Sequence, residues 1–234
     1  MRIALIGASG FVGSRILAES LRRQHRVSAL VRHPQRLAAQ PNMTAVAADV
    51  FDRPALVATL RGHDALISAY NPGHDASANP NLYRDIVEGS LAILDSAKRA
   101  EVAYTVYIGG AGSLQVAPSL MLADDPGFPA KYDQHVPEAL KHFAKQKAQS
   151  IDVPRAGRIS QLLFQGDHSF NWSFISPPLY MEPGVRTGQY RDRGDEFPWD
   201  TDRPAGISIE DLAVAVLDEC EQRRHLHQHF TVTR

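Results

Sequence analysis

The chain has 234 residues, 44% of them hydrophobic, a formal net charge of −1 and a single cysteine. One cysteine excludes an internal disulfide, and a nearly neutral chain without long basic runs argues against nucleic acid or an acidic membrane as an obligate partner. The length and the apolar content predict one α/β domain, residues 1–234, with a small loop-rich lobe.

The apolar runs of the sequence are short. The opening run, Ile3 to Ile6, is too short for the core of a signal peptide, and no stretch reaches the length of a transmembrane helix. The lone cysteine, Cys220, suits a reducing compartment. We therefore expect a cytoplasmic protein, and we expect it to be a monomer or a homodimer.

Apolar segments typical of buried strands alternate with segments whose apolar residues recur at helical spacing. The expected strands are residues 2–6, 27–31, 43–48, 64–69, 102–108, 172–175 and 229–232. The expected helices are residues 14–23, 54–60, 81–99, 137–149, 157–165 and 209–221. In the longest helix, the residues expected to face the core are Leu82, Ile86, Leu91 and Leu94. This alternation predicts a Rossmann-type, doubly wound parallel sheet with helices on both faces.

A glycine-rich turn, Gly7-Ala8-Ser9-Gly10-Phe11-Val12-Gly13, joins the first strand to the first helix. A dinucleotide presents a doubly charged pyrophosphate, which free backbone amides at a helix N-terminus hold well. Gly7 would permit the tight turn, Gly10 the close approach of the backbone, and Gly13 the packing of helix against sheet. The turn therefore predicts a dinucleotide site, and glycines that serve packing alone are the alternative.

Three other residues of the turn have expected roles. We expect Phe11 and Val12 to be the first helical residues, with their N–H groups directed at the pyrophosphate, and Ser9 to add a hydroxyl contact. The spacing is G-x-x-G-x-x-G rather than the standard G-x-G-x-x-G. The preceding strand and the following helix therefore carry the assignment.

The end of the second strand distinguishes the two nicotinamide dinucleotides. An acidic residue there binds the ribose 2′-hydroxyl of NAD, whereas this chain has Arg32 and His33. Arg32 is placed to pair with a 2′-phosphate and to stack on adenine, which favours NADP(H) over NAD(H). The alternative is a solvated surface arginine.

Residues that follow the other strands are further candidates, because ligands of such sheets lie across the carboxyl ends of the strands. Asp49 could accept a hydrogen bond from the adenine amino group while Val50 packs against the ring, and a capping or turn aspartate is the alternative. The remaining candidates for cofactor binding are Ala69, Tyr70, Asn71, Gly109, Gly110 and Pro177.

Two irregular segments, residues 115–171 and 179–206, contain many prolines and interrupt the alternation of strands and helices. We expect them to form a substrate lobe, or a lid over the nicotinamide end of the cofactor. Pro154 is expected to break the helical pattern in the first of these segments.

Several segments together resemble the short-chain dehydrogenase/reductase superfamily in its atypical branch. They are IALIGASGFVG (3–13), LVRHP (30–34), GHDALISA (62–69), FISPP (174–178), PGVRTGQYR (183–191) and ISIEDLA (207–213). The resemblance covers nearly the whole chain and is strongest to NADH-flavin reductases, with NmrA-like proteins and biliverdin reductase B as more distant relatives. It implies a Rossmann fold that binds NAD(P).

One feature of the superfamily is missing. None of the seven tyrosines has a lysine four residues later, so the catalytic Tyr-x-x-x-Lys pair, in which lysine lowers the tyrosine pKa for proton donation, is absent. Ser113 falls near the superfamily's catalytic-loop serine and could polarise a substrate carbonyl or ring atom. The alternative is a serine that caps or closes a turn.

Reduction of a flavin or quinone tolerates this loss, because hydride passes to an electron-poor ring and the proton can come from solvent. The leading hypothesis is therefore an NADP(H)-dependent oxidoreductase that acts on a flavin, a quinone or a similar small aromatic acceptor. The aromatic residues that could stack on this acceptor, or else pack within the core or the lobe, are Tyr70, Phe128, Tyr180 and Trp199.

Two other functions and a metal site compete with this hypothesis. A non-catalytic NADP(H)-binding redox sensor of the NmrA type fits the missing pair equally well, whereas a sugar-nucleotide epimerase or dehydratase needs the tyrosine base. His225, His227 and His229 would share one face of an extended segment, but a solvated approach to a strand is favoured over a metal site. We expect no metal.

Overall fold

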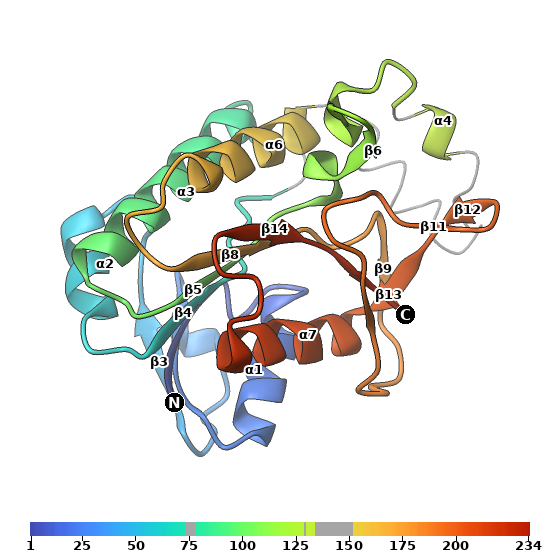
Figure 1. Ribbon diagram of the computed structural model, residues 1–234. Helices are drawn as coiled ribbons and strands as arrows, with labels where there is room; N and C mark the ends of the chain where they lie inside the picture. The colour runs from blue at the N-terminus through green and yellow to red at the C-terminus, as the bar shows by residue number, and fades with distance from the viewer. Residues whose placement is uncertain (74–77, 129, 134–151) are drawn as a thin grey trace.

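The computed structural model describes residues 1–73, 78–128, 130–133 and 152–234. Its centre is a seven-stranded sheet of order β14-β8-β5-β4-β1-β2-β3, in which every pairing is parallel (Figure 1). The strands are β1 (Arg2–Ile6), β2 (Arg26–Val31), β3 (Met43–Ala47), β4 (Ala65–Ser68), β5 (Thr105–Ile108), β8 (Trp172–Ile175) and β14 (Gln228–Phe230). This order confirms the predicted Rossmann-type fold and places the reversal of strand order between β1 and β4.

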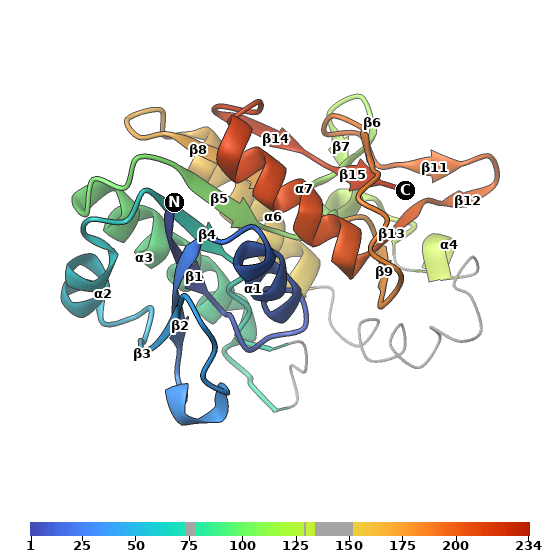
Figure 2. The ribbon, with the colours of Figure 1, turned by 90° about the horizontal axis from the view of Figure 1, so that it is seen from below.

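Helices cover both faces of the sheet (Figures 1 and 2). Ile3 and Leu5 of β1 belong to the apolar cluster on the side of α1 and α7, whereas Ala4 and Ile6 belong to the cluster on the side of α2, α3 and α6. Both sets are buried because successive side chains of a strand point to opposite faces. The helices are α1 (Gly13–Arg22), α2 (Arg53–Leu60), α3 (Leu82–Arg99), α6 (Asp152–Gln165) and α7 (Ile209–Gln222).

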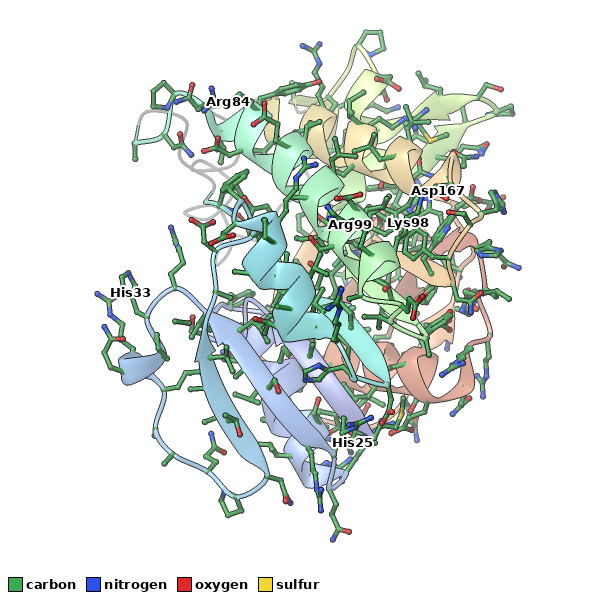
Figure 3. All side chains as sticks on the ribbon, turned by 90° about the vertical axis from the view of Figure 1, so that its left-hand side faces the viewer. His25, His33, Arg84, Lys98, Arg99 and Asp167 are labelled. Atoms are coloured by element: carbon green, nitrogen blue, oxygen red, sulfur yellow. The ribbon has the colours of Figure 1, made fainter. Side chains whose placement is uncertain are left out.

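Further contacts fasten the helices to one another and to the sheet. α1 packs beside α7, and α3 packs beside α6. The Lys98 ammonium lies 2.6 Å from a carboxylate oxygen of Asp167, which ties the end of α3 to the loop that precedes β8 (Figure 3). No helix in the described ranges is both long enough and apolar enough to cross a membrane.

Three local expectations are wrong. β5 begins at Thr105 rather than at residue 102, and the predicted strand 229–232 is two strands, β14 and β15 (Val232–Thr233). β15 leaves the main sheet to pair antiparallel with β10 (Arg191–Asp192). Leu91 is 39% exposed, because Ala92 and Ile93 occupy the core-facing side of α3 at that turn.

Pro154 does not break the helix in which it lies. It is the third residue of α6, where the backbone N–H has no partner within a helix, so a proline there removes no hydrogen bond. The predicted helix 137–149 lies outside the described residues.

Apart from α6, which covers a face of the sheet, the described short elements of segments 115–171 and 179–206 lie toward the carboxyl ends of β5 and β8 (Figure 1). They share a small apolar cluster, here called the lobe cluster, formed by Leu114, Leu122, Tyr132 and Phe197. The short elements around it are β6 (Gln115–Ala117), β7 (Leu120–Met121), α4 (Ala130–Asp133), β9 (Tyr180–Glu182), β11 (Trp199–Asp200), β12 (Arg203–Pro204) and β13 (Gly206–Ser208).

Candidate cofactor and active site

The chain leaves β1 through Gly7, whose φ of +78° lies in the left-handed region. A Cβ atom on Gly7 would lie 2.4 Å from the carbonyl oxygen of Ala69, and one on Gly13 would lie 2.0 Å from the carbonyl oxygen of Gly7. Neither position accepts a larger residue without displacing backbone. The two glycines therefore hold the start of α1 against the exits of β1 and β4, where the strand order reverses.

The N-terminal end of α1 is open for an anion. α1 begins at Gly13, Val12 is its N-cap without a capping side chain, and the first turn holds no acidic residue. The prediction that Phe11 and Val12 are the first helical residues is therefore wrong. Their amides nevertheless have no hydrogen-bond partner in the described chain, so they remain available to a ligand at the positive end of the helix dipole.

Gly10 differs from the other two glycines. A Cβ atom there would meet only the Gly7 carbonyl oxygen, at 3.2 Å. Gly10 and Ser9 are both exposed. The space beside Gly10 is thus free for the close approach of a phosphate, which stays the predicted role of this residue.

Arg32 and His33 follow β2 and are exposed, and His33 lies on a loop at the outer edge of the molecule (Figure 3). Among the described residues, no carboxylate forms an ion pair with Arg32. The next turn, η1 (Pro34–Arg36), brings Arg36 to the wall of a cleft of about 410 Å³ that also includes Ser9 and Gln40. The predicted adenosine end of the site therefore carries two arginines, Arg32 and Arg36, that form no ion pair among the described residues.

The residues after β3 and β4 have local roles. Asp49 accepts a hydrogen bond from the Phe51 amide at 3.0 Å, which is the turn role considered as its alternative, while Val50 is only 8% exposed. Asn71 accepts one from the Gly73 amide at 2.8 Å. Ala69 and Asn71 follow β4 directly, so their backbone lies beside the glycine turn.

Tyr70 packs on helix α3 rather than standing free. Its hydroxyl donates to the Asp85 carbonyl at 3.1 Å, and a Cβ on Gly89 would meet its ring at 2.4 Å. Burial, followed by the nearby Tyr107 and Asp85, raises the pKa of Tyr70 above its usual range. Tyr70 is therefore a neutral packing residue in this structure.

The exits of β5, β8 and β14 bring two serines and a histidine together. Ser113 ends the turn η2 (Ala111–Ser113), Ser176 follows β8, and His229 lies in β14. The Ser113 and Ser176 hydroxyl oxygens are 2.7 Å apart, and Ser176 Oγ is 2.9 Å from His229 Nε2. Sequence reasoning selected Ser113 but missed the other two as partners. Their separations along the chain, 63 and 53 residues, left no local pattern.

Gly109, Gly110 and Pro177 frame this group. A Cβ on Gly109 would meet the Phe174 ring at 2.2 Å, whereas one on Gly110 would have no atom within 4 Å. Pro177 is buried after β8. Gly110 thus has open space at its Cβ position, and its carbonyl oxygen lies 3.0 Å from the Ser113 hydroxyl oxygen.

This geometry agrees with the comparison of the chain with known families. A family model for NAD(P)H binding matches residues 7–222. The chain belongs to this NAD(P)H-binding family. A protein of the same kind from Bacillus subtilis, the uncharacterized protein YwnB, is 32% identical over 237 residues, which cover 99% of this chain and 98% of that protein.

Solved structures share the fold over the full length. A candidate exported protein from Burkholderia pseudomallei is 36% identical with a TM-score of 0.79, and the match covers 100% of both chains. A candidate epimerase from Bacteroides thetaiotaomicron is 35% identical with a TM-score of 0.81, covering 99% of this chain and 96% of that one. A candidate NADH-flavin reductase from Streptococcus pneumoniae has a TM-score of 0.78 at 24% identity, covering 100% and 99%.

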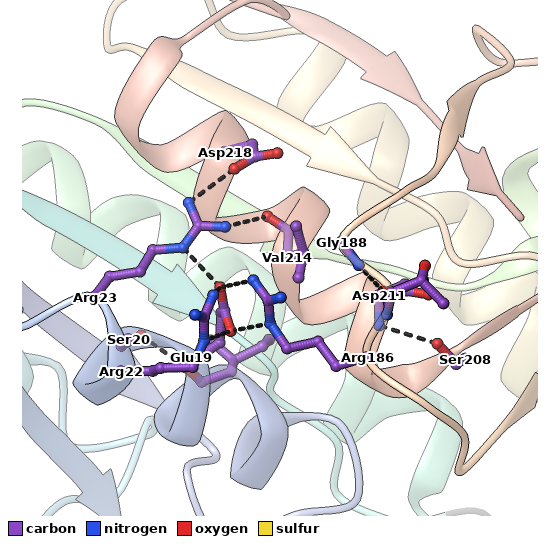
Figure 4. A network of polar contacts seen from close by, with 12 residues as sticks. Glu19, Ser20, Arg22, Arg23, Arg186, Gly188, Ser208, Asp211, Val214 and Asp218 are labelled. Atoms are coloured by element: carbon purple, nitrogen blue, oxygen red, sulfur yellow. Dashed lines mark hydrogen bonds and ion pairs between the residues drawn. The ribbon is translucent and has the colours of Figure 1, made fainter.

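Segment 183–191, one of those that resemble the superfamily, is held against α1 and α7 by a network of charged and polar contacts (Figure 4). Glu19 is 4% exposed and accepts hydrogen bonds from Arg22, Arg23 and Arg186 at 2.7–3.0 Å. Thr187 and Gly188 donate backbone N–H groups to Asp211 at 2.8 Å. Segment 183–191 therefore lies against α1 and α7 through Glu19 and Asp211.

The remaining candidates are dispersed. His225 lies within 2.8 Å of carboxylates of Glu219 and Asp192, and His227 bonds to the Phe170 carbonyl, so the three C-terminal histidines face different partners. In the described ranges no group of three or more His, Cys, Asp or Glu side chains is arranged to hold a metal ion. The predicted stacking residues do not form one wall, because Phe128, Tyr180 and Trp199 all contact Tyr132 in the lobe while Tyr70 lies on α3.

Proposed function

We propose that this protein is an NADP(H)-dependent reductase that transfers hydride to a flavin, a quinone or a similar aromatic acceptor. The observation that carries the proposal is the open N-terminus of α1 at the reversal of strand order, where the Phe11 and Val12 amides have no partner among the described residues. Membership of an NAD(P)H-binding family supports it. The name of the Streptococcus pneumoniae relative, a candidate NADH-flavin reductase, points to the same class of acceptor.

The residues present fit the cofactor. The turn from Gly7 to Gly13 would hold the pyrophosphate, and Arg32 would pair with the 2′-phosphate. When bound, the reduced nicotinamide supplies a hydride, and its ring would lie toward the exits of β4, β5 and β8. Ser113 would orient the acceptor there. An epimerase is disfavoured because no tyrosine has the lysine partner that such chemistry uses.

The test is consumption of NADPH by the purified protein with FMN, riboflavin and quinones, with NADH in parallel. Turnover above the background without protein is expected, with NADPH preferred. The matched variant is Gly10→Ala, since its Cβ would require only a small shift of the Gly7 carbonyl oxygen, at 3.2 Å, but would fill the predicted phosphate space, and this variant should lose turnover. A protein that binds NADPH by fluorescence yet turns over no acceptor would instead be the NADP(H)-binding sensor.

Replacing Arg32 by alanine should weaken NADPH binding by about 10- to 100-fold and leave NADH binding unchanged. A hydrogen bond to a charged group contributes about 1.5–3 kcal/mol, and only NADPH carries the 2′-phosphate. Titration of nicotinamide fluorescence measures both affinities. Arg26→Ala is the control, because Arg26 is exposed at the opposite end of β2. An Arg32→Ala variant that still prefers NADPH would overturn the assignment.

A further inference from the structure

The contacts among Ser113, Ser176 and His229 fit two directions of hydrogen bonding, because either serine can donate to the other and the role of His229 Nε2 follows the ring tautomer. In the first direction, Ser113 donates its single hydroxyl hydrogen to the Gly110 carbonyl and accepts from Ser176, and Ser176 accepts from His229 Nε2. The neutral ring then carries its proton on Nε2 and leaves Nδ1, which has no hydrogen-bond partner among the described residues, as the acceptor. The proposal below uses this first direction.

The surroundings of His229 keep the ring neutral. Its ring stacks edge-on against Phe174, with centroids 5.5 Å apart, and Arg158 of α6 is the charged group that acts on it in the described structure. Arg158 in turn contacts Asp124 and Gln161. Burial, and then the charge of Arg158, lower the pKa of His229 to about 4. At pH 7 the neutral ring can thus donate the proton on Nε2 and accept another proton on Nδ1.

We propose that Ser113, Ser176 and His229 form a proton-delivery chain, in which Ser113 protonates the reduced acceptor and His229 restores the proton from solvent. This proposal rests on the proposed reductase function. The chain would replace the missing Tyr-x-x-x-Lys pair with groups from three different strand exits. It favours acceptors that develop charge on an oxygen or nitrogen, such as quinones, because such an atom needs a proton after hydride transfer.

The protons balance in a single shift along the chain. After hydride transfer, the charged acceptor atom takes the proton of Ser113, so the Ser113 O–H bond breaks as the new bond forms. Ser113 takes the proton of Ser176, and Ser176 takes the Nε2 proton of His229. His229 binds a proton from water at Nδ1 and ends as the other neutral tautomer. The net transfer is one proton from solvent to the acceptor.

Acceptor access to Ser113 comes from the side of Gly110. Ser113 is 1% exposed, so protein atoms cover almost all of it in this structure, and the proposal has the acceptor approach its hydroxyl group. The space beside Gly110 is open, and an acceptor oxygen placed there can take over the hydrogen bond that the Gly110 carbonyl now receives. Ser113 is the group that touches the acceptor, whereas Ser176 and His229 act through it.

The decisive variant is His229→Gln, because a glutamine amide can still donate to Ser176 but cannot pass a proton from one atom to another. With a quinone acceptor, kcat should fall by about 100-fold or more, with unchanged NADPH affinity. The wild-type kcat should stay flat between pH 5 and 8, whereas the variant's kcat should fall as pH rises. Imidazole in the buffer should restore turnover to His229→Gly. The control, His227→Asn, should leave kcat unchanged, since the His227 ring contacts the Phe170 carbonyl, His168 and Trp172 and has no hydrogen bond to Ser113, Ser176 or His229 in the described structure.

Nitrogen-15 NMR of the imidazole provides a readout independent of turnover. The neutral Nε2–H tautomer is expected from pH 5 to 8 and should be lost in Ser176→Ala. An Nδ1–H tautomer in the wild type would overturn the proposed proton-delivery chain. Turnover that survives His229→Gln with an unchanged pH profile would overturn this proposal alone, whereas a wild type without any turnover would overturn the reductase function as well.

Discussion

Replacing Gly7 by alanine should lower the free energy of unfolding by about 2–5 kcal/mol, or prevent folding. A residue with a side chain costs about 1–2 kcal/mol at a left-handed position, and overpacking adds about 1–3 kcal/mol. Both apply at Gly7, where φ is +78° and a Cβ would lie 2.4 Å from the Ala69 carbonyl oxygen. Urea unfolding followed by circular dichroism measures the loss.

Gly62 offers a matched control for this experiment. It has the same φ of +78°, but a Cβ there would meet only the flexible end of Arg2, at 3.8 Å. Gly62→Ala should therefore cost only about 1–2 kcal/mol. Equal losses of unfolding free energy in the two variants would show that the contact between Gly7 and the Ala69 carbonyl is not tightly packed.

Replacing Glu19 by glutamine should lower the free energy of unfolding by about 2–4 kcal/mol at pH 7. Removing one partner of a buried ion pair costs about 3–5 kcal/mol, and the partly exposed arginine heads reduce that cost here. Burial alone would raise the pKa of Glu19, but hydrogen bonds from Arg22, Arg186 and Arg23 outweigh it and hold the pKa well below the usual range.

The pH dependence identifies the charge as the cause. Because the folded pKa is depressed, the carboxylate contributes its full stability above the unfolded pKa of about 4.3, and this contribution declines as pH falls further. The difference in the free energy of unfolding between wild type and Glu19→Gln, measured by urea unfolding, should thus become smaller from pH 7 to pH 3. Glu221→Gln, whose carboxylate is 30% exposed, should cost at most about 1 kcal/mol. A difference in the free energy of unfolding that stays constant with pH would indicate that the variant loses packing and not charge interactions.

The sheet was predictable because its strands are buried on both faces and are therefore apolar throughout. The start of β5 could not be predicted, since Val102 and Tyr104 are buried although they lie outside the strand. Leu91 was misplaced because spacing alone does not tell which of several apolar residues a neighbouring helix covers. Pro154 was read as a helix breaker, although the first turn of a helix tolerates proline.

The glycine turn predicted to bind the cofactor could be found in the sequence because it is one continuous segment, whereas the serine–histidine group could not. The spacing of the three histidines suggested a shared face, but residues 224–227 form a turn and His227 has a φ of +56°. His225 consequently faces Glu219, and His229 faces Ser176. Neither orientation follows from an alternating pattern, because the pattern assumes an extended backbone.

The two halves of the site also differ in how much chain must close to build them. β1, the glycine turn, β2, β3 and β4 come from residues 2–68 in one stretch, whereas η2, β8 and β14 span residues 111–230. Longer loops cost more closure entropy, and non-local contacts slow folding. We infer that dinucleotide-binding competence arises early in refolding and the acceptor side assembles last, an order that pulse-labelled amide exchange would reveal.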